Sequence, residues 1–245
     1  MTHVEGWQLR IRIINKVEKY VPGNSPICSH RNLGQKSKLW SQIENLAVFF
    51  TNKYKYLING IEKSDSFCFN AHKTLGVPLS TSILVVQDSE KLHNSFTSQA
   101  SYLYQTHEKE YNLGYNSFEC GRRNNALKFW TMWKAIGTKG IASIINHEFD
   151  LADYAREYIT SNKDYTLYSF NQSLSVCFNY KNYDPIDLCT KLYEYNKLMV
   201  GFGDFNNRCF VRLVTINAEN SKENILTFFK TIEDFTKEFD SEIKK

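Results

Sequence analysis

The chain has 245 residues, of which 42% are hydrophobic and 15% aromatic, so it can bury a large core in one or two globular domains. Thirty basic residues against 26 acidic ones leave a net charge of +4, too small and too dispersed to favour nucleic acid or an anionic membrane as a partner. The longest apolar runs, such as Leu46–Phe50, fall far below the roughly 20 residues of a membrane span, and the first residues contain no apolar signal core. A cytoplasmic protein is therefore predicted.

The six cysteines and six histidines are scattered along the chain. They form no Cys-x-x-Cys pair, and no cysteine has a histidine beside it at the spacing of metal ligands. We expect reduced, mostly buried thiols and no metal site. Only His72 has a chemically suggestive neighbour, which is Lys73.

The first part of the chain has little regular pattern. From Gln8 to Asn52 apolar and basic residues alternate without a sustained period, which predicts that residues 1–52 form a poorly organised segment or an insertion. The exception is the stretch from Lys38 to Phe50. Four apolar residues there would share one face of a helix: Leu39, Ile43, Leu46 and Phe50.

Two short apolar runs, Ser66–Phe69 and Ser82–Val86, are typical of buried strands, and the polar turn between them contains Lys73. A lysine attacks an aldehyde only when it is unprotonated, and burial against such strands would favour that state. An isolated Asn70-Ala-His-Lys73 would instead be an ordinary surface loop.

A helix is predicted from Asn124 to Ile136, ended by Gly137, with an apolar face formed by Leu127, Trp130 and Trp133. A second helix, from Thr138 to Thr160, would connect two structural units. We expect its inward residues to be apolar: Ile141, Ile144, Ile145, Ala152, Ala155 and Ile159.

Beyond Asn162 strands and helices alternate, which predicts a small α+β domain. The last helix has Asn220 and Glu223 at the spacing of a capping box. The predicted strands are Thr166–Phe170, Ser175–Tyr180 and Cys209–Asn217, and the predicted helices are Pro185–Met199 and Lys222–Phe239.

The segment Gly60–Leu79 around the lysine, with Cys120-Gly-Arg-Arg123 and Lys128-Phe-Trp130 further on, resembles the lysine region of the group II pyridoxal-phosphate-dependent amino acid decarboxylases. The glutamate, cysteine sulfinate and aspartate decarboxylase branch is the most similar. The resemblance implies an α/β fold: the C-terminal part of the large domain of the aspartate aminotransferase-like transferases over residues 53–145, and a small α+β domain over 146–245.

In that family the lysine forms a Schiff base with pyridoxal phosphate, which implies this role for Lys73, although Ala71 stands where the family usually has proline. By resemblance His72 lies beside the cofactor and its phosphate, and a structural loop histidine is the alternative. The His3–Trp7 segment resembles the family's His-Val-Asp-Ala-Ala motif. Glu5 would then pair with the cofactor's ring nitrogen; otherwise it is an exposed acid near a terminus.

The segment Cys209–Asn217 resembles the late Phe-Arg-x-Val strand of the family, whose arginine binds the substrate carboxylate. The resemblance carries this role to Arg212, and a surface arginine on an edge strand is the competing interpretation. Arg122, in the Cys-Gly-Arg-Arg run, is predicted to be structural or to form an interface.

The resemblance extends from Lys53 to Phe239 and corresponds to the second half of a family member. It implies pyridoxal-phosphate-dependent decarboxylation of an acidic amino acid, namely cysteine sulfinate, aspartate or glutamate, by a fragment of a homodimeric enzyme. The segment Thr131-Met-Trp-Lys134 slightly favours the cysteine sulfinate and aspartate branch. The alternative is an inactive, decarboxylase-derived remnant that acts as a dimerisation or binding module; a nucleic-acid binder is disfavoured.

Overall fold

The fold was analysed in a computed structural model that describes residues 12–13, 40–42, 46–79, 81–90, 123–205 and 207–243. The described residues divide into two compact units, with the boundary between Lys139 and Gly140. The sequence-based boundary between residues 145 and 146 lies further along the same helix. Each unit combines helices with a four-stranded sheet, so each is described by itself.

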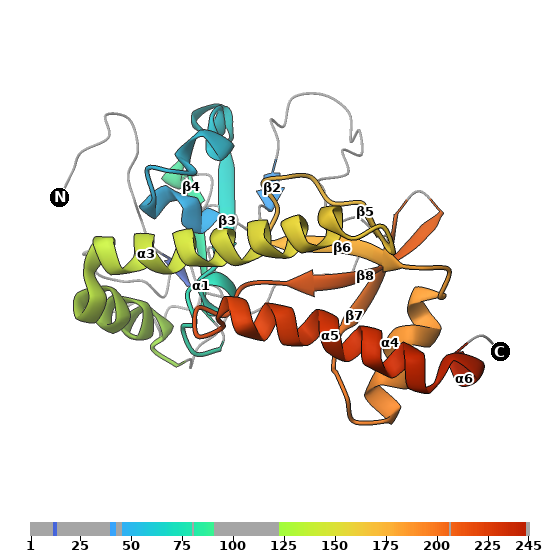
Figure 1. Cartoon of the computed structure of the whole chain (residues 1–245). Coiled ribbons are helices and arrows are strands. Elements are labelled where there is room, and N and C mark those ends of the chain that lie inside the picture. The colour runs from blue at the N-terminus through green and yellow to red at the C-terminus, as the bar shows by residue number, and fades with distance from the viewer. Residues whose placement is uncertain are drawn as a thin grey trace, which may run out of the picture. The chain divides into compact units, whose positions relative to one another are not determined.

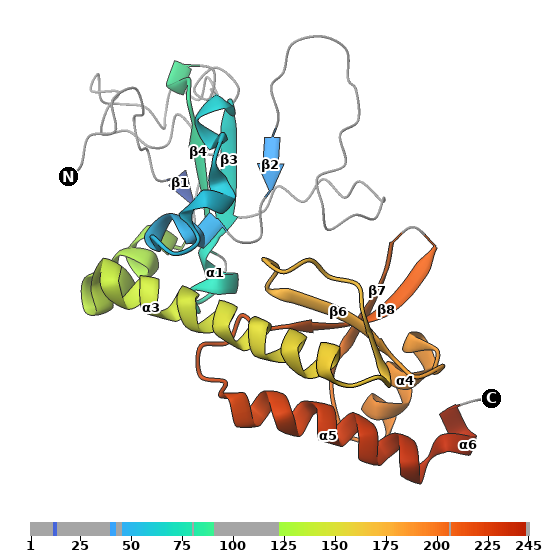
Figure 2. The ribbon, with the colours of Figure 1, turned by 45° about the horizontal axis from the view of Figure 1, so that its top comes forward.

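The sheet of the first unit has the order β1-β4-β3-β2 (Figure 2). The predicted lysine-flanking strands are present as β3 (Ser66–Asn70) and β4 (Ser82–Val86), which pair antiparallel. Two strands from the segment predicted to be poorly organised complete the sheet: β1 (Arg12–Ile13) pairs antiparallel with β4, and β2 (Trp40–Gln42) pairs parallel with β3.

The helical face predicted between Lys38 and Phe50 is wrong, because β2 is a strand and only the end of the stretch is helical. Backbone pairing with β3 stabilises the extended conformation of β2, which a local periodicity does not reveal. Short 3₁₀-helices then lead into β3: η1 (Leu46–Phe50), η2 (Lys55–Ile58) and η3 (Ile61–Lys63).

The long helix α3 (Asn125–Ser161) begins in the first unit and ends in the second. The predicted break is present, because Gly137 has φ 68° and ψ 176° inside the helix. The predicted apolar face is wrong at two of its three residues: Leu127 is 50% exposed and Trp130 56% exposed, whereas Trp133 is half-buried and Phe129 is buried. Phe129 lies against Phe50, Phe69 and Trp133, so the buried face is the one that contains Phe129.

The second unit contains an antiparallel sheet with the order β5-β6-β8-β7 (Figure 1). Its strands are β5 (Tyr165–Leu167), β6 (Ser175–Tyr180), β7 (Gly201–Phe205) and β8 (Arg208–Val214). Three helices follow the pattern expected of a small α+β domain: α4 (Pro185–Glu194), α5 (Lys222–Glu238) and α6 (Asp240–Ile243).

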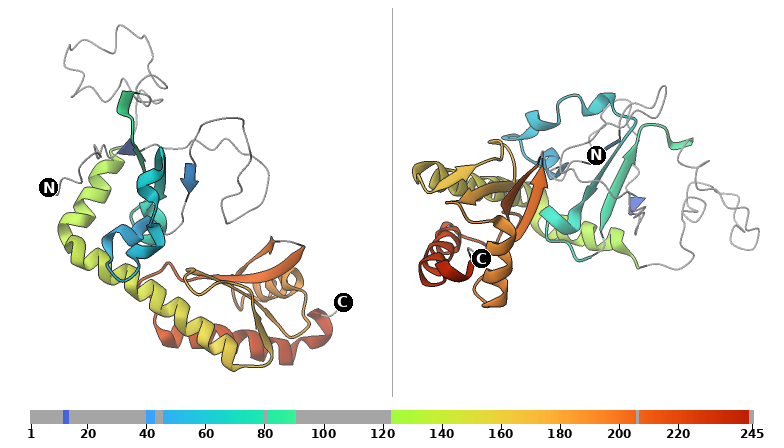
Figure 3. Two further views of the ribbon diagram at one scale, coloured as in Figure 1. Left: turned by 90° about the horizontal axis from the view of Figure 1, so that it is seen from above. Right: turned by 90° about the vertical axis from the view of Figure 1, so that its right-hand side faces the viewer.

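The second half of α3 lies beside α5, and the two helices run along the sheet of their unit (Figures 1 and 3). Aromatic rings join the layers: Tyr158 of α3 stacks on Phe229 of α5 with centroids 4.5 Å apart, and Phe229 also meets Phe178 of β6 at 5.6 Å. Side chains alternate along a strand, so α5 covers the face of β6 that contains Phe178. This face forms the core of the unit.

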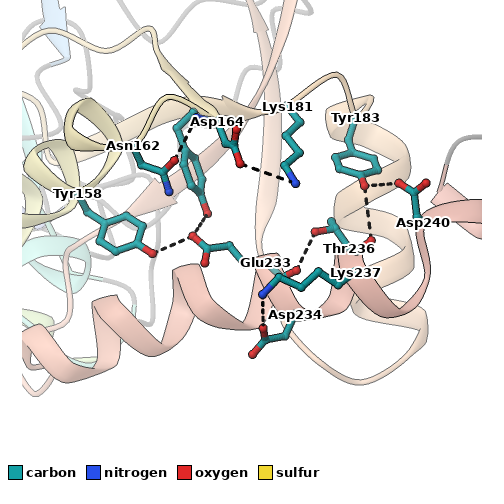
Figure 4. A network of polar contacts seen from close by, with 11 residues as sticks. Tyr158, Asn162, Asp164, Lys181, Tyr183, Glu233, Asp234, Thr236, Lys237 and Asp240 are labelled. Atoms are coloured by element: carbon teal, nitrogen blue, oxygen red, sulfur yellow. Dashed lines mark hydrogen bonds and ion pairs between the residues drawn. The ribbon is translucent and has the colours of Figure 1, made fainter.

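A polar network fixes the same helix pair (Figure 4). The carboxylate of Glu233 on α5 accepts hydrogen bonds from the hydroxyls of Tyr158 at 2.8 Å and Tyr165 at 3.2 Å. Burial, together with the hydrogen bond to Glu233, raises the pKa of Tyr158 to about 12. The phenols therefore stay protonated at neutral pH and continue to donate.

Capping groups set where the helices of the second unit begin. Asp184 accepts hydrogen bonds from two backbone amides at the start of α4, with Pro185 in the first turn as predicted. The predicted capping pair of α5 is wrong: Ser221 and Asn224 form the capping box, one residue later than the sequence spacing indicated. The helix predicted to reach Met199 ends at Glu194, and Met199 is 90% exposed.

Within the described ranges no helix is long and apolar enough to cross a membrane. Across the same ranges no three or more His, Cys, Asp and Glu side chains are grouped as metal ligands. The four cysteines in the described ranges form no disulfide bond, and Cys189 is the buried one among them.

Candidate active site

Lys73 lies on a single helical turn, α1 (Ala71–Thr74), that directly follows β3. Ala71 and Thr74 are buried, whereas the Lys73 side chain is exposed. The turn therefore fixes the backbone of the lysine by its buried neighbours and presents the amine outward. The desolvation expected from the flanking strands is not observed, because Lys73 lies beyond the end of β3 rather than between the strands.

Gly76 ends this turn. Its φ of 62° places it in the left-handed region, where only glycine has no steric cost, and the amides of Leu75 and Val77 both donate to the carbonyl oxygen of Ala71. The chain reverses here within a few residues. The glycine that interrupts the sequence after the lysine thus has a direct structural purpose.

His72 is held by the backbone of Thr81, a fully buried residue just before β4. The Thr81 carbonyl oxygen accepts the His72 amide at 3.3 Å, and the ring Nδ1 lies 3.1 Å from the Thr81 nitrogen and 2.9 Å from its oxygen. One ring nitrogen cannot donate and accept at once, and the buried Thr81 amide needs an acceptor. We therefore assign Nδ1 as the acceptor and place the ring proton on Nε2.

The start of α3 supports the other side of the turn. The Lys128 ammonium donates to the Leu79 carbonyl oxygen at 2.7 Å, and the adjacent Phe129 meets Phe69 of β3 with ring centroids 6.4 Å apart. Both residues belong to the Lys128-Phe-Trp130 run, so this run packs against the segment that contains Lys73. The run braces the turn that presents Lys73.

Arg212 lies in the middle of β8, paired with Cys177 on one side and Gly201 on the other. It is half-buried, and its Nε and Nη2 both donate to the hydroxyl of Ser175, at 3.2 and 3.0 Å. Arg212 is thus not on an edge strand, since β8 has neighbours on both sides. The competing interpretation of an edge-strand arginine is wrong.

The predicted residues fall in both units. Lys73 and His72 are adjacent in the first unit, and Arg212 belongs to the second. Glu5 and Arg122 lie outside the described residues.

The sequence did not reveal two supporting residues, Thr81 and Ser175. Thr81 sits in a run of small polar residues with no distinguishing pattern, and its link to His72 depends on the closing of the turn. Ser175 becomes recognisable only with the β6–β8 register, which places it diagonally from Arg212 on the same face.

A comparison with family models matches residues 44–181 to the pyridoxal-dependent decarboxylase conserved domain. The acidic amino acid decarboxylase of Mus musculus is 31% identical over 216 residues, which are 78% of this chain and 39% of that protein. The cysteine sulfinic acid decarboxylase of Homo sapiens is 33% identical over 161 residues, 62% of this chain and 32% of that protein. The chain thus spans less than half the length of these relatives.

Among solved structures, TDC from Oryza sativa, crystallised with PLP and tryptamine, superposes with a TM-score of 0.73 over 82% of this chain and 44% of that one. The identity is 18%, so the likeness concerns the fold. It confirms the α/β fold that the resemblance implied.

Proposed function

This chain belongs to the pyridoxal-dependent decarboxylase family, and on that premise we propose that it acts in the pyridoxal-phosphate-dependent decarboxylation of an acidic amino acid. The observation that carries the proposal is the exposed Lys73 on a turn that His72, Thr81 and Lys128 brace. The two named relatives act on acidic amino acids by their names, which supports cysteine sulfinate, aspartate and glutamate as the substrate class.

The residues present fit pyridoxal phosphate at two of its three functional groups. The aldehyde needs an accessible amine, which Lys73 provides. The phosphate needs donors, and with the tautomer assigned above His72 offers its Nε2 proton. For the ring nitrogen we propose the carboxylate of Glu5. Bound pyridoxal phosphate supplies an electron-withdrawing ring that accepts the electron pair of the departing carboxylate.

Two side chains of this chain would then hold the cofactor and the substrate. Lys73 would hold the cofactor through its amine, and Arg212 would bind a substrate carboxylate through its planar guanidinium. The braces on the turn limit the positions that the lysine amine samples, which is how a rigid turn contributes to rate.

Reductive labelling tests the role of Lys73. The purified chain is incubated with pyridoxal phosphate and borohydride, and peptide mapping locates the reduced label. We expect the label on Lys73 in preference to other exposed lysines such as Lys163, because the braced turn and the His72 donor favour binding there. Lys73→Arg should remove the label, and the matched Lys163→Arg should leave it in place. Equal labelling of both lysines at saturating cofactor would contradict the proposal.

A second candidate, a dimerisation or binding module without activity, is favoured by the exposed Leu127 and Trp130 on α3. Carbon dioxide release from the three acidic amino acids and sedimentation of the same sample discriminate the candidates. Release by the isolated chain would exclude the inactive module. A dimer without release, dissociated by Trp130→Ser, would support it.

A further inference from the structure

Arg212 projects from the face of the second sheet that α5 does not cover. Phe178 and its partner Val211 face α5, because the Phe178 ring meets Phe228 and Phe229 on that helix. Residues alternate between faces along a strand, so Arg212 points to the opposite face. Residues directly opposite in a ladder share a face, so three more residues lie on this side: Cys177 and Gly201, paired with Arg212, and Ser175, paired with Val214.

The Arg212 guanidinium leans toward β6. Its Nε and Nη2 converge on the single oxygen of Ser175, which lies on β6. Two donors bound to one oxygen fix both the direction and the plane of the fork. Ser175 thus contributes to the direction in which the cation of Arg212 faces.

On the other side of Arg212 the sheet is open. Gly201 of β7 is exposed, and none of the described atoms lies within 4 Å of the position a Cβ would take there. Gly203, two residues further along the same strand, differs: a Cβ there would lie 3.1 Å from the Phe210 ring. The open space therefore lies at Gly201, which is paired with Arg212, and not at Gly203.

The backbone of Gly201 is fixed, although the space that a Cβ would occupy there is open. It pairs with Arg212 in the ladder, and its carbonyl oxygen lies 3.8 Å from the Cys189 thiol of α4. Its φ is not in the left-handed region, so the conformation does not itself require glycine. Nothing in the local backbone explains a glycine there, whereas a ligand that approaches the guanidinium along β7 does.

We propose that Ser175 and Gly201 shape a carboxylate seat around Arg212, with Ser175 as a positioning residue and Gly201 as a specificity-determining one. The inference rests on the proposed function and deepens it. The carboxylate of an acidic amino acid, or of a simple dicarboxylate, lies beside the guanidinium in the space over Gly201. A side chain at position 201 would occupy that space.

Calorimetric binding of glutarate to the full chain tests the seat, since glutarate has two carboxylates and no amine to react with a cofactor. We expect binding by the natural chain and its loss in Arg212→Met. Ser175→Ala should weaken binding about tenfold, because a charge-assisted contact that orients the guanidinium is lost, and Ser175→Thr should restore it. Gly201→Val should abolish binding by filling the space, with Gly201→Ala intermediate.

Two matched variants control for charge and fold. Arg208→Met removes the same charge from the same face of β8, and Thr166→Ala removes an exposed hydroxyl from β5; both should bind glutarate normally. Because Gly201→Val fills open space on a strand, its thermal midpoint should not fall, so lost binding cannot be assigned to unfolding. Circular dichroism on every variant checks this.

The outcomes separate the seat from the proposed function. No glutarate binding by the natural chain, or full binding by Gly201→Val, would overturn the seat. Glutarate binding without carbon dioxide release would support the carboxylate seat. It would count only against the proposed decarboxylase activity. Where carbon dioxide is released, Ser175→Ala should raise KM and leave kcat within about twofold, because uniform binding is lost. A fall in kcat with unchanged KM would contradict the positioning role.

Discussion

Glu148 on α3 is fully buried, and neither of its carboxylate oxygens has a hydrogen-bond partner among the described residues. Its backbone oxygen accepts a hydrogen bond from the Thr215 hydroxyl at 3.0 Å, which links the helix backbone to the residue after β8. The carboxyl group of Glu148 takes no part in this contact. Burial raises the pKa of Glu148 from 4.5 to about 8. The side chain is therefore mostly neutral at pH 7.

A raised carboxyl pKa makes the second unit less stable as pH rises. Between pH 4.5 and about 8 the unfolded chain releases the Glu148 proton and the folded chain keeps it, so the free energy of unfolding falls through this window and levels off above it. Glu148→Gln stays neutral throughout. Its stability advantage should be small near pH 5 and grow to on the order of 4–5 kcal/mol at pH 8.5.

Hydrogen exchange of peptides from the second half of α3 measures the Glu148 effect locally, with rates corrected for the intrinsic effect of pH. Glu157→Gln, at an exposed position of the same helix, should show no growing advantage. A pH-independent difference between Glu148→Gln and the natural chain would show that the acid is not desolvated.

The surroundings of single residues were predictable where neighbours in the sequence determine them. The strands that flank Lys73 were predicted from their apolar runs and are confirmed, whereas the roles of Lys73 and His72 stay predictions. The exposure of Lys73 was not predictable, because it depends on which residues pack from elsewhere in the chain. Glu148 lies on the predicted inward face of its helix with Ile141 and Ala152, but an acidic side chain is rarely buried, so its burial was not predicted.

At the scale of elements, Gly137 is the clearest local determinant. Its φ of 68° with ψ 176° is a combination that only glycine adopts without strain. Gly137→Ala should therefore lower stability by about 1–3 kcal/mol, although no clash with the new methyl group is expected. The thermal midpoint by circular dichroism measures this.

Gly140 provides the matched control for Gly137, because it lies three residues later in α3 with helical dihedral angles. Alanine stabilises a helix interior relative to glycine by up to about 1 kcal/mol, so Gly140→Ala should leave the midpoint unchanged or raise it. Equal losses in the two variants would mean that the backbone of Gly137 is not the reason for its glycine.

Strand prediction succeeded where residues typical of turns bound a run of β-branched or aromatic residues. The predicted bounds of β4 and β6 match the structure, whereas β7 was missed because Gly201-Phe-Gly-Asp-Phe205 has the composition of a turn. Its extended conformation comes from pairing with β8. Leu127 and Trp130 of α3 were misassigned for a related reason: Phe129 and Trp133 both pack on Phe50, whereas Trp130 is exposed.

At the scale of the whole molecule, the two units carry different optical probes. All four tryptophans precede Gly140, so the second unit contains none. Compact units of this size can unfold independently. In urea we expect tryptophan fluorescence to report the first unit with one midpoint, and hydrogen exchange of α5 peptides to report the second with another.

The Glu148→Gln variant also serves as the control for separate unfolding. At pH 8 it should shift the transition reported by α5 and leave the fluorescence transition where it was, because Glu148 lies in the second unit. Coincident transitions that both shift would indicate one cooperative molecule.

The outer strands of the first sheet have a practical consequence for protein production. Both β1 and β2 come from residues that precede the match to the family domain, which begins at residue 44. An expression fragment cut at that residue would expose the backbone amides and carbonyls on the outer sides of both β3 and β4. Such bare edges recruit other chains, so that fragment should accumulate in inclusion bodies.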